Sequence, residues 1–144
     1  GPTPVYEFPM WREFSRVLFR SEIVLGGYVR VAVGDVVGSA RLWLHREIAG
    51  YAGNYFYRSF YGRTGFSKEM AAAQAATERG DAAAAASAIT QEMQDQVAVV
   101  GSPAHCQREV EKRRSLGLQL PVIAPFPVGD VMTSYKRTIE AFGG

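Results

Sequence analysis

The spacing of hydrophobic and polar positions predicts a chain with few strands and many helices. Two apolar runs have the length of strands, at 28–33, where β-branched residues gather, and at 118–124. The helix ahead of the second run has marked ends, because Ser102 can cap it, Pro103 suits its first position and Gly117 can close it. A helix that returns through glycine into an apolar strand is half of the repeat of parallel α/β folds.

The residues between these strands predict helices separated by short breaks, from about 39 to 95. Apolar side chains recur there at helical spacing, and the members of this stripe are Leu44, Ile48, Tyr51 and Tyr55. A loop at 61–65 precedes a helix that Ser67 can cap. Gly80 ends that helix, and Asp81 can cap the next one, over 82–94. The buried edge of this last helix is expected to carry Ala85, Ile89 and Met93.

Two further elements are expected near the ends of the chain. A final helix begins near Asp130, and its inward face is expected to carry Met132, Tyr135, Ile139 and Phe142. A short strand is expected at 4–6. Because the connections between strands are too long for hairpins, we expect the three strands to lie parallel and adjacent, with helices outside.

Charge and composition exclude several classes of protein. The 144 residues carry 16 basic and 14 acidic side chains, and the net charge of +2 is too balanced to indicate a nucleic-acid partner. The single cysteine excludes a disulfide within the chain and is typical of an intracellular, cytoplasmic protein. No apolar run approaches the roughly 20 residues of a membrane-spanning helix, so no membrane partner is expected.

A series of short motifs occurs in order along residues 22–142. They are Gly27–Val33, Tyr51, Tyr55, Tyr57-Arg58, Gly65-Phe66, Gly80-Asp81, Val100–Pro103, Gly117 and Leu120–Val122. This order resembles the luciferase-like oxidoreductases of the bacterial luciferase superfamily, and among them the deazaflavin-dependent branch. The resemblance implies an α/β fold, the carboxyl-terminal part of a (β/α)8 TIM barrel with a helical insertion over about 39–95. Such a barrel typically needs about 250 residues, so an incomplete, helix-rich barrel with few parallel strands is implied.

The resemblance also implies a chemistry. In this family an isoalloxazine-type ring lies at the carboxyl-terminal mouth of the barrel, where it exchanges hydride with an organic substrate or reacts with oxygen. The implied cofactor is the deazaflavin coenzyme F-420, with FMN as the alternative. The implied partners are a small-molecule substrate and, for the parent protein, a second copy of itself. With few barrel strands, the fragment alone is expected to be inactive.

The first 21 residues depart from the family pattern. Residues 1–6 resemble the start of an earlier strand, after which the family has a glycine-containing loop, a helix and another strand. Residues 7–21 instead read EFPMWREFSRVLFRS. The string VLFRS is what a common sequencing adapter encodes, so a chimeric junction is expected here, followed by the barrel portion at 22–144. A basic amphipathic helix is the competing interpretation.

Few residues carry an obvious chemistry. The turn from Gly34 to Ser39 lacks the lysine and the glycine spacing of phosphate-binding loops. His45 and His105 each lack a second ligand at metal spacing, so no metal site is expected. Cys106 follows His105, but successive helical side chains point about 100° apart, and Cys106 is therefore interpreted as a small core residue rather than a nucleophile.

An aromatic stretch over 51–66 is the best candidate for a substrate pocket, because its rings are too numerous for one helical stripe. The candidate pocket residues are Tyr51, Tyr55, Arg58 and Phe66, with rings that exclude water and a cation that meets an anionic group. Packing of the helical insertion against the barrel is the competing interpretation of each ring. A noncatalytic helical interaction domain and a truncated reading frame without function are the alternatives to an enzyme.

Overall fold

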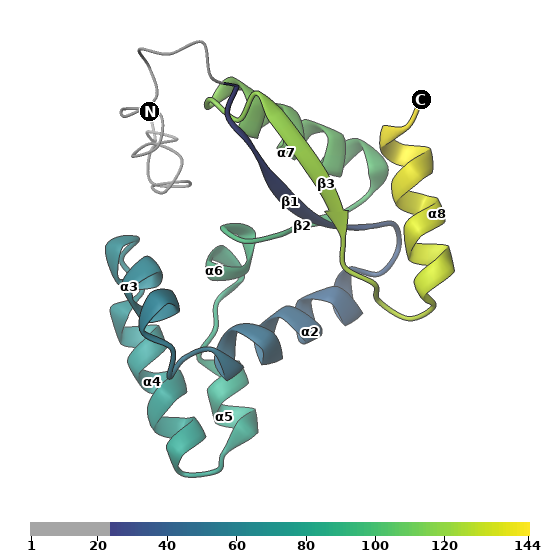
Figure 1. The fold of residues 1–144 in the computed structure, drawn as a ribbon. Coiled ribbons are helices and arrows are strands. Elements are labelled where there is room, and N and C mark those ends of the chain that lie inside the picture. Colours follow the sequence, from purple (N-terminus) through teal and green to yellow (C-terminus); the bar gives the residue numbers. More distant parts are fainter. Residues whose placement is uncertain (1–23) are drawn as a thin grey trace. The chain divides into compact units, whose positions relative to one another are not determined.

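The computed structural model describes residues 24–144, which divide into two compact units (Figure 1). The first, here called the sheet unit, comprises residues 24–37 and 97–144 of the described chain. The second, the helical unit, comprises residues 38–96. The strand predicted at 4–6 and the junction predicted at 7–21 lie outside the described residues and stay predictions.

Three parallel strands form the sheet, in the order β2-β1-β3. They are β1 at Gly26–Val33, β2 at Val99–Gly101 and β3 at Leu120–Pro125. The parallel, adjacent pairing predicted for the runs at 28–33 and 118–124 is confirmed, since residues 26–31 of β1 pair with residues 120–125 of β3. Strand β2 was not predicted, because three residues are too few to show a period.

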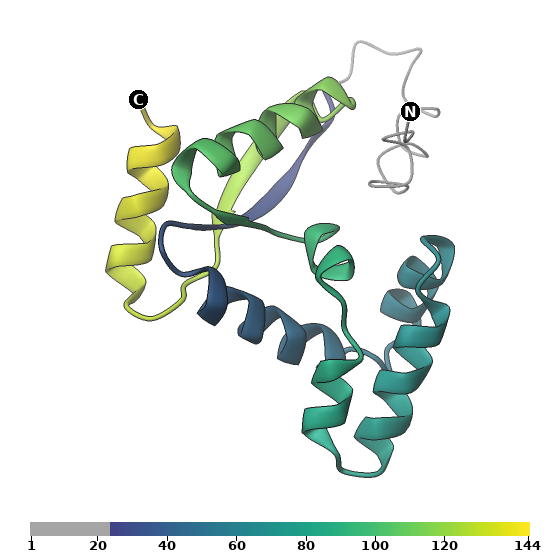
Figure 2. The same ribbon diagram turned by 180° about the vertical axis from the view of Figure 1, so that it is seen from behind.

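Two helices pack on the sheet, α7 at Pro103–Ser115 and α8 at Val131–Phe142. Figure 2 shows α7 lying over the strands. Alternate side chains of β1, at Val29, Val31 and Val33, are buried in one cluster with side chains of both helices. The full cluster consists of Val29, Val31, Val33, Val99, Cys106, Val110, Leu118 and Ala141, with Ile123 and Phe142 packed against it.

The opposite face of the sheet is exposed at several apolar positions of β1 and β3. Tyr28 lies opposite Val122 in the register of β1 and β3, and their side chains are 76% and 42% exposed. Leu120, two residues earlier on the same face of β3, is 55% exposed. The sheet unit therefore buries one face of its sheet and presents apolar side chains on the other.

The outer edge of β3 carries prolines. The backbone N–H groups of Leu120 and Phe126 donate to carbonyl oxygens on and next to β1, both at 3.0 Å. Because N–H directions alternate along a strand, the backbone groups of Pro121, Ile123 and Pro125 point away from β1. Proline has no N–H, so Ile123 is the residue of these three that presents a donor at this edge.

The ends of α7 agree with the prediction. The Ser102 side chain accepts a hydrogen bond from the backbone N–H of His105 at 3.2 Å, and Pro103 opens the helix. Gly117 follows the helix with a φ of +114°, which only glycine adopts readily. These local signals were sufficient to place both ends.

The predicted inward face of α8 is wrong for three of its four residues. The helix begins after Asp130 as expected, with the Asp130 carboxylate accepting from the N–H of Thr133 at 2.7 Å. Yet Met132, Tyr135 and Ile139 are exposed by 74%, 42% and 67%. The small side chains of Thr138 and Ala141 are the buried ones, because they let the helix lie close to the sheet. Phe142 does pack against the core, as predicted.

Five helices form the helical unit: α2 at Val37–Gly50, α3 at Tyr55–Arg63, α4 at Ser67–Glu78, α5 at Ala82–Ser87 and α6 at Gln91–Asp95. Leu44 and Ile48 are buried as predicted. The predicted continuation of their stripe through Tyr51 and Tyr55 is wrong, because α2 ends before Tyr51. Asn54 then caps α3 by accepting from the N–H of Phe56 at 2.9 Å.

Two other boundaries differ from the prediction. Residues 61–63 form the last turn of α3, so the loop predicted at 61–65 is shorter. Ser67 lies inside α4, and the cap position belongs to Phe66, which makes no side-chain capping bond. The helix predicted over 82–94 is divided, because the Thr90 hydroxyl caps α6 at the N–H of Met93 (3.2 Å).

The capping and burial predicted for that segment are otherwise confirmed. The Asp81 carboxylate accepts from the N–H of Ala84 at 3.0 Å. Ala85, Ile89 and Met93 are each at most 3% exposed. Alanine side chains on α4 and α5 allow these two helices to pack closely against each other.

Candidate functional site

The carboxyl ends of the three strands meet at one edge of the sheet, where open parallel sheets and barrels hold ligands. Gly34 follows β1, and its N–H donates to the carbonyl of Gly101 at the end of β2 (2.8 Å). Phe126 follows β3, and its N–H donates to the carbonyl of Val31 in β1 (3.0 Å). These two bonds tie the three strand ends together and make this edge a fixed frame.

A cationic side chain lies against the end of β1. Gly34 has a φ of +114°, in the region that favours glycine. A Cβ atom at this position would lie 3.0 Å from Cδ and 3.5 Å from Nη1 of Arg137. The absence of a side chain at Gly34 therefore lets Arg137 of α8 reach the carboxyl edge.

The end of β2 is similarly close to a histidine. A Cβ atom at Gly101 would lie 2.8 Å from Cδ2 of His105, so the imidazole occupies the space next to this glycine. Asp35, which follows Gly34, is exposed. The carboxyl edge therefore combines a guanidinium, an imidazole and a carboxylate from three different segments.

Cys106 faces away from this chemistry. Its thiol is fully buried and donates to the carbonyl of Gly101 at 3.5 Å. Burial raises the pKa of the Cys106 thiol to about 11; the hydrogen bond to Gly101 lowers it, and the charge of Glu109 raises it further. A thiol that stays protonated at neutral pH is a poor nucleophile, and its interpretation as a core residue is confirmed.

The loop after β3 is rigidly attached to α8. The Ser134 hydroxyl donates to the carbonyls of Val128 (3.2 Å) and Asp130 (3.1 Å), and accepts from the N–H of Val128 at 3.3 Å. Residues of β1, this loop and α8 leave a space between them that is too tight for a water molecule. On the open side, the Arg30 guanidinium lies 5.2 Å from the ring centroid of Phe126.

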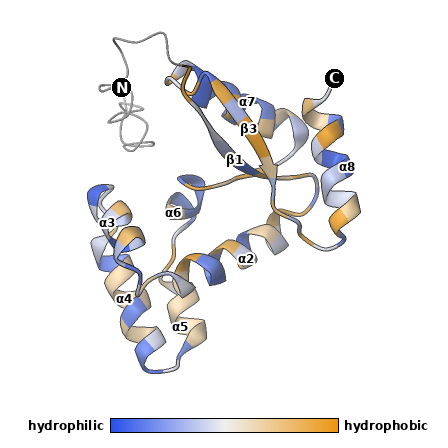
Figure 3. Ribbon diagram, viewed as in Figure 1, coloured by the Kyte–Doolittle hydropathy of each residue, from blue (hydrophilic) through white to orange (hydrophobic). Residues whose placement is uncertain are grey.

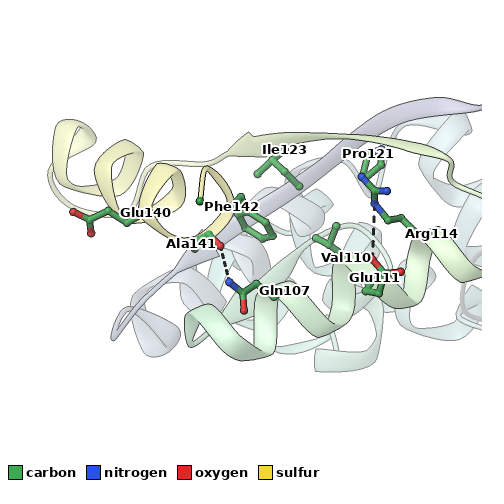
Figure 4. A pocket seen from close by; sticks show the side chains of 10 residues that line it. Gln107, Val110, Glu111, Arg114, Pro121, Ile123, Glu140, Ala141 and Phe142 are labelled. Atoms are coloured by element: carbon green, nitrogen blue, oxygen red, sulfur yellow. Dashed lines mark hydrogen bonds and ion pairs between the residues drawn. The ribbon is translucent and has the colours of Figure 1, made fainter.

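A groove of about 570 Å³ lies elsewhere in the sheet unit, between α7, β3 and the end of α8 (Figure 4). Val110, Ile123 and Phe142 give it an apolar floor. Gln107 crosses from α7 to α8, with its Nε2 donating to the carbonyl of Ala141 at 2.6 Å. Because Ile123 lies in the middle of β3 and Ala141 at the far end of α8 from the strand ends, the groove is separate from the carboxyl edge.

The four pocket residues predicted from sequence lie in the helical unit, and two of them, Tyr51 and Phe66, belong to two separate aromatic contacts. Tyr51 stacks on Tyr57 with ring centroids 4.4 Å apart and planes inclined by 6°. Phe66 meets Tyr61 edge to face, with centroids 6.4 Å apart.

The other two predicted residues are exposed on α3. Tyr55 is 78% exposed. Arg58 is also exposed, and its Nη1 donates to Oε1 of Gln74 at 2.8 Å. None of these contacts tests whether the four residues line a pocket, so their role stays a prediction.

Sequence reasoning did not single out the most buried polar groups of the helical unit. The Tyr61 ring is fully buried, and its hydroxyl donates to the carbonyl of Met93 at 3.0 Å. Gln94 is also fully buried: its Oε1 accepts from Arg41 at 3.3 Å, while its Nε2 has no partner. The Arg41 guanidinium also contacts the Asp95 carboxylate at 2.6 Å. No sequence motif marks these residues, because their partners are far along the chain.

Residues 24–144 contain no group of three histidine, cysteine, aspartate or glutamate side chains placed to hold a metal ion. In the same range, every helix is too short or too polar to cross a membrane.

A parallel sheet with helices on its outside and tied strand ends belongs to the α/β class, whose ligand sites lie at the carboxyl edge. The family model described as luciferase-like monooxygenase matches residues 7–120, which is most of the chain. The chain therefore belongs to the luciferase-like monooxygenase family, and its general kind is that of an oxidoreductase. No curated protein and no solved structure matches it.

Proposed function

We propose that this chain supplies the carboxyl-terminal strands and helices of a luciferase-like barrel enzyme that passes hydride between a deazaflavin coenzyme and a small organic substrate. FMN is the alternative coenzyme. The observation that carries the proposal is the family match over residues 7–120. A parallel sheet with a fixed carboxyl edge supports it, because barrel enzymes hold their ligands at that edge.

The residues at the carboxyl edge fit the anionic end of such a coenzyme. Both coenzymes carry a phosphate, and Arg137, which lies against Gly34 at the end of β1, is the residue we propose for it. Asp130, in the loop before α8, is not a phosphate ligand, because its carboxylate caps α8 and would repel a phosphate. When bound, the coenzyme supplies the hydride chemistry, and the chain contributes position and charge.

Three strands are too few to enclose the coenzyme ring. A closed barrel of this type has eight strands, and the described part of the chain has β1, β2 and β3. We therefore expect the 144-residue chain to show no turnover alone, because water is not excluded from the ring.

In the test, this chain is fused to the carboxyl end of the earlier barrel strands of another family member. This fusion, here called the graft, is compared with the chain alone. The graft should oxidise reduced deazaflavin in the presence of substrate, followed by the absorbance of the coenzyme, and the chain alone should not. Arg137→Gln in the graft should raise the KM for the coenzyme about tenfold, the loss of one charged hydrogen bond. Lys136→Gln, which changes the neighbouring exposed cation, is the matched control and should leave the KM unchanged.

The outcomes distinguish the two coenzymes and also decide whether the proposal holds. Turnover with FMN and not with deazaflavin would select the alternative coenzyme. Turnover with neither, in a folded graft, would reject the proposal, as would turnover by the chain alone.

A noncatalytic interaction domain is the second candidate function, and the exposure of Tyr55 and Phe56 favours it. This function predicts a protein partner that binds without any coenzyme. Tyr55→Ser should then abolish co-purification of that partner, while the graft stays inactive.

A further inference from the structure

Arg137 and His105 border the same hydrogen-bonded pair of strand ends. Gly34 follows β1 and donates its N–H to the carbonyl of Gly101, at the end of β2, over 2.8 Å. A Cβ atom at Gly34 would lie 3.0 Å from Cδ and 3.4 Å from Nε of Arg137. A Cβ atom at Gly101 would lie 2.8 Å from Cδ2 of His105. Because neighbouring strands are about 4.8 Å apart, α7 and α8 each bring one nitrogen-bearing side chain to a small area of the carboxyl edge.

The imidazole of His105 meets Gly101 through its carbon atoms. The three atoms nearest to the Cβ position of Gly101 are Cδ2, Cγ and Cβ of His105, at 2.8, 3.3 and 3.5 Å. Within residues 24–144, neither ring nitrogen of His105 has a hydrogen-bond partner. His45, the other histidine of the chain, instead has its Nδ1 3.0 Å from the carbonyl oxygen of Ala86. His45 therefore makes a structural contact, whereas the nitrogens of His105 are available to a ligand.

The guanidinium of Arg137 also lacks a partner. Arg137 is half-buried, and over the described range it makes no ion pair and no hydrogen bond through its side chain. Partial removal of a cation from water costs free energy unless an anion compensates the charge. The oxygens of a phosphate match the donors of a guanidinium, and an imidazole N–H adds another donor.

The carboxylates near these two side chains do not compensate them. Those of α7, α8 and the loop before α8 already have partners: Glu109 with Arg113, Glu111 with Arg114, Glu140 with Lys136, and Asp130 with the N–H of Thr133. Asp35 is exposed, and in the described part of the chain its carboxylate bonds to neither Arg137 nor His105. The two side chains therefore do not form a histidine–carboxylate pair, and an incoming anion can reach both.

We propose that His105 and Arg137 together bind a phosphate group at the carboxyl edge of the sheet unit. Arg137 supplies the positive charge, and His105 donates a hydrogen bond through a ring nitrogen, so that the anion bridges α7 and α8. Assigning this phosphate to the coenzyme rests on the proposed function, whereas the binding itself does not. A phosphorylated substrate presents the same oxygens, and the experiment distinguishes the two sources.

The experiment titrates the full chain with inorganic phosphate, at constant pH and ionic strength, and follows the imidazole signals by NMR. The chain has two histidines, so His45 is an internal control. The signals of His105 should shift until the site is saturated, and those of His45 should stay in place. Arg137→Gln should weaken phosphate binding about tenfold, the loss of one charged hydrogen bond. Lys136→Gln, which changes the neighbouring exposed cation, should leave the affinity unchanged.

A second set of measurements tests His105 and the source of the phosphate. His105→Phe keeps a ring next to Gly101 but removes both ring nitrogens, so calorimetry should show phosphate binding weakened several-fold. Circular dichroism of each variant verifies that it is folded. Displacement of inorganic phosphate by FMN, and not by riboflavin, which lacks the phosphate, would assign the site to the coenzyme. Displacement by phenyl phosphate and not by FMN would assign it to the substrate.

Several results would overturn the proposal. They are the absence of a saturable shift at His105, equal shifts of both histidines, an unchanged affinity in Arg137→Gln or His105→Phe, or an equal loss in Lys136→Gln. Inorganic phosphate that neither FMN nor phenyl phosphate displaces would be an adventitious ion only, which would also overturn it. Phosphate binding together with an inactive graft would reject the enzyme proposal and leave this one standing. Turnover by the graft without a shift at His105 would do the reverse.

Discussion

The sheet unit and the helical unit differ in where they leave apolar side chains exposed. The helical unit encloses its largest apolar side chains apart from the short aromatic segment and two positions on α2, and Tyr61, Met70 and Met93 are each at most 1% exposed. The sheet unit leaves Tyr28, Leu120 and Val122 exposed on one face of its sheet, and it leaves Met132, Tyr135 and Ile139 exposed on α8. Figure 3 shows β3 mostly in the hydrophobic colour. Parallel sheets are normally covered on both faces. The difference teaches that the helical unit contains a core of its own, while the sheet unit presents a surface suited to further packing.

The largest expected effect tests the core of the helical unit. Leu44→Ala removes a side chain with no exposed surface and should lower the free energy of unfolding by about 2–5 kcal/mol. Leu42→Ala on the same helix removes a side chain that is 50% exposed and should change it by less than about 0.5 kcal/mol. Urea unfolding followed by circular dichroism measures both. Equal effects of the two substitutions would mean that this unit lacks a defined core.

A titration of Cys106 tests whether the core of the sheet unit excludes water. The pKa of the thiol is about 11 in the folded chain against 9.0 for an unperturbed thiol. Between these values the Cys106 thiol loses its proton in the unfolded chain and keeps it in the folded chain. The contribution of this thiol to the free energy of unfolding is therefore fully present below pH 9 and is lost as the pH rises toward 11. The loss should reach roughly 2–3 kcal/mol.

Urea unfolding of the chain and of Cys106→Ala at a series of alkaline pH values measures this loss. The variant is expected to be less stable overall, because it leaves a cavity beside Val110. Its stability should nevertheless lack this part of the pH dependence. The same slope in both proteins would assign the alkaline loss to other groups.

A smaller effect separates a true helix cap from an apparent one. Ser102→Ala in the sheet unit removes the bond to the N–H of His105 and should cost about 1 kcal/mol. Ser67→Ala in the helical unit should cost almost nothing, because Ser67 is inside α4 and does not cap it. Thermal unfolding of the two variants tests this, and a loss at Ser67 equal to that at Ser102 would contradict the boundary of α4.

The smallest effect on stability is expected on the outer side of α8. Met132→Gln with Ile139→Gln replaces side chains that are 74% and 67% exposed, so the free energy of unfolding should be almost unchanged. Self-association should decrease, because the apolar surface of the sheet unit is reduced. Sedimentation equilibrium measures the average mass. If the original chain associates and the variant has the same average mass, the contact lies on another surface. If the original chain is a monomer, the predicted self-association through α8 is wrong.

Local signals explain how much of the fold could be predicted. The caps at Asp81, Ser102 and Asp130 act through bonds within three residues, so the sequence reveals them directly. The strands β1 and β3 were predicted from their apolar, β-branched runs, and their parallel pairing was predicted because the connection between them is too long for a hairpin. The face of α8 could not be predicted by period alone, since the buried side is set by close packing of Thr138 and Ala141.

The candidate site was less accessible to prediction. The turn before Asn54 folds the chain so that Tyr51 stacks on Tyr57, whereas a continuous helix would have aligned Tyr51 with Tyr55. The approach of Arg137 to Gly34 joins residues about a hundred positions apart, and no spacing rule reports such a contact. The number of aromatic rings in the sequence indicated a candidate region at 51–66, but tertiary contacts decide which of those side chains meet.

The proline edge of β3 has a mechanical consequence. A strand that joins the sheet along this edge finds acceptor carbonyls at Pro121, Ile123 and Pro125 but a donor at Ile123 only, and two pyrrolidine rings project toward it. Most of the backbone hydrogen bonds that β3 would donate in a normal strand ladder are missing at this edge. In any larger sheet or barrel built on this unit, the joint along β3 is therefore the seam that parts first under load or denaturant, while the joint between β1 and β3, bonded along its whole length, parts later.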